Sequence, residues 1–187
     1  VPSARLKRWN LAMFVFHLAF GVIALAVGKL SLRVPVYSSK LGLKILPNNT
    51  RAWAYAPEVP HRVGWLYLTW MVASFSLLSA LFHLGNGVLW RKRYERCLEQ
   101  AYAPFRWVEY SFSASVMVLL LAYIAGSVFM NTMVLLFGLT FITMTFGHLH
   151  EVICRPASED EWAGSTLWRL QAHLIGYIPQ VFAWAIV

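Results

Sequence analysis

The chain has 187 residues, of which 59% are hydrophobic and only 13% are charged. Soluble globular domains carry roughly 25% charged residues, so this composition excludes an ordinary soluble domain and indicates that lipid surrounds most of the chain. A net charge of +8 could suggest nucleic-acid binding. The basic residues, however, cluster just outside the apolar stretches, as residues that set membrane topology do. We therefore expect a protein of the lipid bilayer that does not bind nucleic acid.

Five stretches are apolar enough to cross the hydrocarbon core, which takes about 20 residues of helix. In chain order they lie at about residues 9–28, 63–89, 105–126, 132–150 and 167–187. Residues 29–62 form an expected external loop, whose alternating segments suggest a small β-hairpin. The sequence thus predicts an all-α membrane protein with a single transmembrane domain, residues 1–187. Because the last apolar stretch runs to Val187 without a polar flank, we expect further spans outside this sequence.

The distribution of Lys and Arg among the short loops predicts the orientation. The N-terminal segment and the connection between the second and third spans are rich in these residues: Arg5, Lys7, Arg8, Arg91, Lys92, Arg93 and Arg96. The short connection at residues 127–131 has none. Because cytoplasmic loops carry the excess of positive residues, we expect an integral protein of the cell membrane with its N-terminus in the cytoplasm.

Three titratable side chains are predicted at membrane depth, where such groups are costly and usually functional. At a helix rise of 1.5 Å per residue, His17 lies roughly 13 Å and His83 roughly 12 Å from the cytoplasmic side. Glu109 lies about 8 to 20 Å from the same side, depending on where its helix begins. The three groups lie on three different spans, so together they predict a polar cavity suited to a buried cation or a proton relay.

Spacing within the helices adds polar neighbours to this cavity. Residues three or four apart share a helix face, which groups Arg106, Glu109 and Ser113 on the third span and Ser79 with His83 on the second. Each has a simpler interpretation when taken alone. A buried histidine can merely satisfy a hydrogen bond, an arginine can extend to the interface, and a serine can bond its own helix backbone. Glu109 is harder to explain in this way, because a long apolar stretch follows it.

A second polar group lies at the cytoplasmic end of the fourth span, in the run His148, His150 and Glu151. Histidine and glutamate side chains can bind a metal ion, but the spacing does not place both histidines on one helix face. We interpret the run as interfacial polar residues and predict no metal site.

A segment of the third span reads Arg106-Trp107-Val108-Glu109-Tyr110-Ser111-Phe112-Ser113-Ala114-Ser115. This segment resembles the third-helix signature of heliorhodopsins, and an Arg three residues before a carboxylate is similar to the counterion helix of microbial rhodopsins generally. His17, Ser79 and His83 match positions where that family has polar residues around its retinal Schiff base. The resemblance implies a seven-transmembrane, microbial-rhodopsin-like bundle with inverted topology, of which five spans are present in this chain.

For the site, the resemblance implies retinal held through a protonated Schiff base with Glu109 as its counterion. Ser79 and Ser113 would hydrogen-bond that carboxylate. A neighbouring helix face would contribute to the retinal pocket through Tyr110, Ala114 and Met117. The family's retinal-bearing lysine lies in its seventh helix, whereas the lysines of this chain fall at span ends or in loops: Lys7, Lys29, Lys40, Lys44 and Lys92. Covalent attachment would therefore need a lysine beyond residue 187.

The resemblance implies that His17, His83 and Arg106 line a cavity that accepts a proton after light absorption. The expected function is a light-sensing photoreceptor that is neither an enzyme nor a pump, forms a homodimer, and has a cytoplasmic signalling partner. Two alternatives stay open. One is a light-gated or passive proton-conducting membrane protein, and the other is a haem-binding membrane subunit that uses His17 and His83 as axial ligands.

Overall fold

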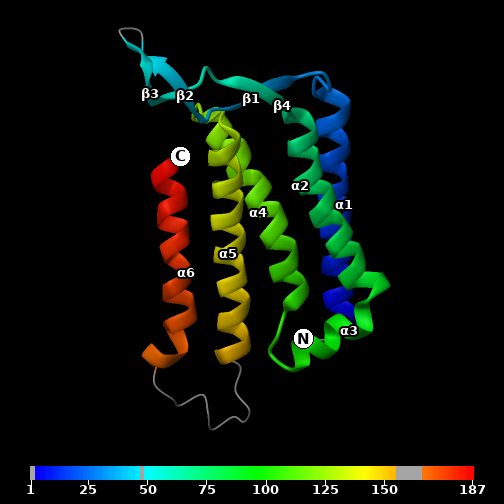
Figure 1. Ribbon diagram of the computed structural model, residues 1–187. Coiled ribbons are helices and arrows are strands. Elements are labelled where there is room, and N and C mark those ends of the chain that lie inside the picture. Colours follow the sequence, from blue (N-terminus) through cyan, green and yellow to red (C-terminus); the bar gives the residue numbers. More distant parts are fainter. Residues whose placement is uncertain (1–2, 47–48, 155–165) are drawn as a thin grey trace.

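The computed structural model describes residues 3–46, 49–154 and 166–187 (Figure 1). Its helices are α1 (Ser3–Val27), α2 (Leu68–Leu84), a π-helical turn η1 (Gly85–Leu89), α3 (Arg91–Glu99), α4 (Pro104–Ile124), α5 (Met130–Cys154) and α6 (Thr166–Ile186). The long helices run side by side, with α1 against α2 at one edge and α4, α5 and α6 following in order (Figure 1). The short helix α3 lies at the end of the bundle that holds the N-terminus.

Four helical segments of the described chain are long and apolar enough to cross a membrane: Ala4–Val27, Leu68–Leu89, Pro104–Ile124 and Met130–Cys154. By length and composition, these segments match four of the five predicted spans. Helix α6 packs along α5 but is not among them, because polar residues including Arg169, Gln171 and Gln180 lower its hydropathy. The fifth span therefore stays a prediction.

Three predicted boundaries differ from those of the helices. The first span was expected from residue 9, but α1 begins at Ser3. The second span was expected from residue 63, but residues 63–67 belong to strand β4 (His61–Tyr67), and α2 begins only at Leu68. The apolar residues of β4 lengthened the hydrophobic stretch without being helical. The fourth span was expected to end at residue 150, but α5 continues to Cys154 and so carries the polar run that follows the apolar stretch.

The expected external loop forms more β-structure than one hairpin. Strand β1 (Arg33–Ser38) pairs with β4, and β2 (Leu41–Leu46) pairs with β3 (Asn49–Pro57), both antiparallel. The backbone N–H of Tyr37 donates to the carbonyl of Val128 at 2.9 Å, which fastens β1 to the connection between α4 and α5. The strands form a layer over the end of the bundle opposite the N-terminus (Figure 1).

Small residues let the helices approach closely. An added Cβ at Gly21 of α1 would lie 2.6 Å from Leu77 of α2, and one at Gly147 of α5 would lie 2.1 Å from the ring of Trp107 in α4. Ala73 on α2 has no exposed surface. Helices in lipid associate through such small residues, since apolar burial alone does not favour protein contacts over lipid contacts.

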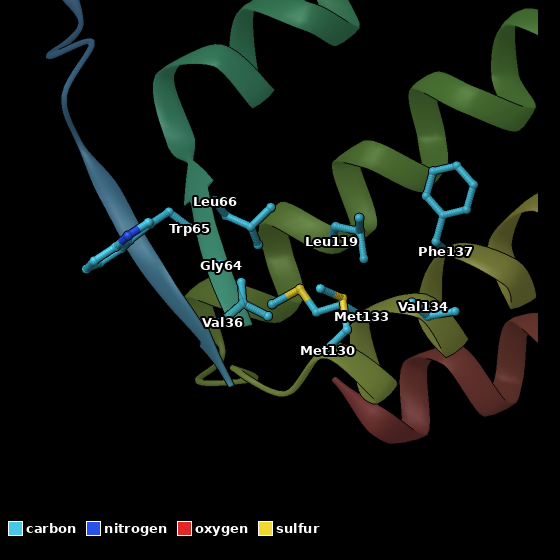
Figure 2. A pocket seen from close by; sticks show the side chains of 9 residues that line it. All are labelled: Val36, Gly64, Trp65, Leu66, Leu119, Met130, Met133, Val134 and Phe137. Carbon is cyan, nitrogen blue, oxygen red and sulfur yellow. The ribbon is translucent and has the colours of Figure 1, made fainter. Parts of the chain in front are cut away.

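An apolar cavity of about 340 Å³ lies beneath the β1–β4 pair. Figure 2 shows Val36 and Leu66 from the strands facing Leu119 of α4 and Met133 of α5 across it. Its lining contains no ionisable side chain. Leu119 follows Glu109 by ten residues, so the cavity lies about 15 Å along α4 from that carboxylate and is separate from the polar site described next.

Candidate functional site

Glu109 is buried in α4 with 7% of its surface exposed. The hydroxyl of Ser79, which is equally buried on α2, hydrogen-bonds its carboxylate. Among the residues that the structure describes, no Lys or Arg forms an ion pair with Glu109. A buried carboxylate whose hydrogen-bond partner is neutral is costly in its charged form unless a cation joins it. Glu109 therefore needs either a proton or a positive charge that the described residues do not supply.

Arg106 bonds a different carboxylate from the one that its spacing suggested. Its Nη2 lies 3.1 Å from Oε1 of Glu151 on α5. The other oxygen of Glu151 accepts the indole N–H of Trp107 at 2.7 Å and the backbone N–H of Ala103 at 3.0 Å. Glu151 thus fixes the start of α4 to the end of α5. In the described part of the chain, no hydrogen bond or ion pair joins Arg106 to either of the two predicted cavity histidines.

His17 of α1 and His83 of α2 do come together. Their rings are stacked with centroids 5.4 Å apart and planes only 9° from parallel. Nδ1 of His83 lies 3.0 Å from Oδ1 of Asn10, a buried residue of α1. The sequence contained a signal for Asn10, since it precedes His17 by seven residues and so lies on the same helix face two turns away.

Serines of α4 mainly bond their own helix. The hydroxyl of Ser111 donates to the carbonyl of Trp107 at 2.8 Å, and that of Ser115 donates to the carbonyl of Ser111 at 2.6 Å. Ser113, predicted beside the counterion, is half-buried. Of the two serines predicted to bond Glu109, Ser79 is the one whose hydroxyl hydrogen-bonds the carboxylate, and it does so from a separate helix.

The predicted retinal-contact face of α4 is largely open. Tyr110 is 43% and Met117 is 44% exposed, and Ala114 between them is half-buried. The three residues lie on a side of α4 that the described helices do not cover. This face can therefore contact a further group without displacing α2 or α5.

The π-helical turn η1 closes the polar site toward the N-terminal end. Trp90 follows it, and its indole N–H donates to Oδ1 of Asn86 at 2.9 Å. An added Cβ at Gly85 would lie 1.8 Å from the Trp90 ring, so only glycine fits beneath that ring. No sequence pattern predicted this irregular turn, because its residues continue the apolar stretch of α2.

The model of the heliorhodopsin family matches residues 6–187, nearly the whole chain. The chain belongs to the heliorhodopsin family. It is thus a rhodopsin-like integral membrane protein, of a family whose chromophore is retinal and which is known for light sensing rather than for enzymatic catalysis. No curated protein matches the chain. The resemblance first seen in the residues around Glu109 therefore covers residues 6–187.

Proposed function

We propose that this heliorhodopsin is a light sensor in which Glu109 is the counterion of a protonated retinal Schiff base and the His17–His83 pair accepts a proton. The observation that carries the proposal is the buried Glu109 carboxylate, which has a neutral hydrogen-bond partner and no described cationic one. At an effective dielectric constant of about 20, opposite charges 4 Å apart attract by about 4 kcal/mol. The site therefore favours a positive charge beside Glu109.

The residues present fit the counterion half of a retinal site. When bound, retinal supplies a protonated imine and a change of shape on light absorption. Glu109 offers the negative charge, and the Ser79 hydroxyl holds that carboxylate in position. The five lysines lie in the first turns of α1, just after α1, in or beside β2, and in α3. Covalent attachment would thus need a lysine beyond residue 187.

The path for a proton runs along one face of α2. Ser79 and His83 are four residues apart, so they lie on the same face, separated by about 6 Å of helix rise. Ser79 contacts Glu109, and His83 stacks on His17. The two histidines thus stand one helical turn from the counterion, toward the end of the bundle that holds the N-terminus.

A sensor is favoured over a pump because, in the described long helices, acid and base side chains lie only toward the N-terminal end of the bundle. Toward the β layer, the long helices contain no Asp, Glu, His, Lys or Arg; this holds for residues 18–27, 68–82, 110–124, 130–147 and 174–186. Net transport needs titratable groups or water access on both sides of the Schiff base. A proton accepted by the histidine pair would return the way it came.

The two alternatives receive less support. A proton conductor meets the same absence of titratable groups toward the β layer. Axial haem ligands must point at one iron from opposite faces of the ring system, whereas His17 and His83 are stacked face to face. No metal-binding cluster of three or more His, Cys, Asp or Glu occurs among the described residues.

We further propose that the N-terminal end of the bundle faces the cytoplasm. Helix α3 lies at this end and carries Arg91, Lys92, Arg93 and Arg96 (Figure 1), the pattern of a cytoplasmic connection. A cytoplasmic signalling partner would meet this basic helix, and we also propose a homodimer. Chemical cross-linking in native membranes, followed by denaturing electrophoresis, tests the dimer: a band at twice the monomer mass supports it, and a monomer band alone contradicts it.

The experiment that separates sensor from pump is the external pH of illuminated cells that express the complete protein and are supplied with retinal. A sensor leaves the external pH unchanged. A sustained change that disappears with a protonophore, and that is lost in Glu109→Gln, would contradict the sensor and indicate proton pumping.

A further inference from the structure

Asn10 stands between the histidine pair and the N-terminal end of the bundle. It is 6% exposed, and its side chain bonds both its own helix and His83 of α2. Its Nδ2 donates to the backbone carbonyl of Leu6 at 3.1 Å, and its Oδ1 lies 3.0 Å from Nδ1 of His83. The side chain therefore bridges the backbone of α1 and the imidazole of α2.

The partners of Asn10 determine which of its atoms faces His83. A backbone carbonyl can only accept a hydrogen bond, so the amide atom that faces Leu6 must be the NH₂ group. The atom that faces His83 is then the amide oxygen, which also can only accept. Nδ1 of His83 must donate and must carry a hydrogen. In a neutral imidazole with a hydrogen on Nδ1, the lone pair that can take up a proton is on Nε2.

We propose that Asn10 is a positioning residue that holds His83 in the Nδ1–H tautomer, so that Nε2 is the atom that receives the proton. This inference rests on the proposed function in taking His83 as part of the proton-accepting pair. Asn10 acts through His83 and need not touch retinal.

The surroundings of Asn10 hold its side chain in place. Gly87 of η1 packs against it, since a Cβ added at Gly87 would lie 3.3 Å from the Asn10 Cβ. Tyr94 of α3 shares a side-chain hydrogen bond with Asn10. Burial raises the pKa of the Tyr94 phenol above its ordinary value, against smaller opposing effects of Asn10 and Arg106. Tyr94 therefore stays neutral at physiological pH and does not compete with His83 as a base.

The stacked partner limits the pair to one proton. His17 faces His83 with ring centroids 5.4 Å apart. Two imidazolium charges at that distance would repel each other by about 3 kcal/mol at an effective dielectric constant of about 20. A single proton is then taken up by whichever ring presents a lone pair to the incoming proton, and the tautomer of His83 decides whether its Nε2 does.

The test is ¹⁵N NMR of the complete protein labelled at histidine, in lipid nanodiscs and without retinal. The shifts of Nδ1 and Nε2 distinguish the two tautomers, and the signals that vanish in His83→Gln assign the residue. In the wild type we expect His83 as the Nδ1–H tautomer. A wild-type His83 with its hydrogen on Nε2 overturns the proposal, and this measurement does not depend on the folding of any Asn10 variant.

Variants at position 10 add a second measurement. Asn10→Leu removes the hydrogen-bond acceptor of His83. We expect the ratio of the Nδ1–H tautomer of His83 to its Nε2–H tautomer to fall by roughly three- to tenfold, because one hydrogen bond stabilises a tautomer by about that factor. Asn10→Asp keeps an acceptor and should keep the Nδ1 hydrogen. Thr69→Val is the matched control, since Thr69 is similarly buried on α2 but bonds the backbone carbonyl of Lys29; it should leave His83 unchanged. An unchanged ratio in a folded Asn10→Leu overturns the proposal.

The same spectra separate this inference from the proposed function. If His83 has the expected tautomer without retinal, but illumination of the retinal-loaded protein never protonates it, the role of Asn10 in setting the tautomer stands and His83 is not the proton acceptor. If the protein binds no retinal at all, the retinal-free measurement still decides whether Asn10 sets the tautomer.

Discussion

The indole N–H of Trp107 donates to the carboxylate of Glu151 at 2.7 Å, across the contact between α4 and α5. The same oxygen of Glu151 accepts the backbone N–H of Ala103, and its other oxygen pairs with Arg106. One carboxylate thus fixes the first turn of the helix that carries Glu109. The position of the proposed counterion depends on this contact as well as on its own burial.

Removal of this carboxylate should destabilise the protein. We expect Glu151→Ala to lower the free energy of unfolding by about 2 kcal/mol, because a partly buried indole N–H and a backbone N–H lose their acceptor. Thermal unfolding in detergent measures the effect. The control is Glu99→Ala, at the exposed end of α3, which should change little. Equal midpoints for the two variants would contradict the role of Glu151.

Two glycines of α5 should respond oppositely to the same substitution. A Cβ at Gly147 would lie 2.1 Å from the Trp107 ring, whereas a Cβ at Gly138 would meet nothing within 4 Å. We expect Gly147→Ala to lower the midpoint of thermal unfolding. Gly138→Ala should leave it unchanged or raise it, since Ala is favoured over Gly in a helix by about 1 kcal/mol. A Gly147→Ala protein as stable as the wild type would show that α4 and α5 do not pack this closely.

The hydrogen bond from Ser79 to Glu109 should tune the colour of the pigment. In Ser79→Ala the carboxylate loses a donor, so more of its negative charge remains available to the cation beside it. We expect the visible absorption maximum to shift to shorter wavelength. Ser74→Ala is the matched control, because Ser74 is exposed on the same helix and bonds the carbonyl of Met71. A shift in the control that equals the shift in Ser79→Ala would contradict this account.

The lengths of the apolar stretches predicted most of the bundle, and strand pairing explains where the prediction failed. Four spans followed from apolar stretches of sufficient length. Val63, Trp65 and Leu66 were assigned to a span, because a strand that lies on the end of a bundle is as apolar as a helix in lipid. The sequence could not distinguish the two until the partner strand β1 was known.

In the candidate site, spacing within one helix could be predicted from the sequence, whereas contacts between helices could not. Local spacing put Ser79 and His83 on one face of α2 and Glu109 at depth in α4. The partner of Arg106 depends on which residue of α5 reaches the start of α4, and spacing within α4 carries no information about it. Asn10 was overlooked because an asparagine near a helix end is common. Its role depends on contact with His83 of another helix, which the sequence does not show.

The counterion role of Glu109 is tested most directly by visible absorption of the complete protein, purified from cells supplied with all-trans retinal. The wild type should show a visible band that hydroxylamine bleaches, as a Schiff-base pigment does. In Glu109→Gln that band should shift to longer wavelength, because the charge that localises the positive charge near the nitrogen is gone. Glu99→Gln is the control and should absorb as the wild type does. A band at the same wavelength in Glu109→Gln and the wild type, or no visible band from the folded complete protein, would contradict the account.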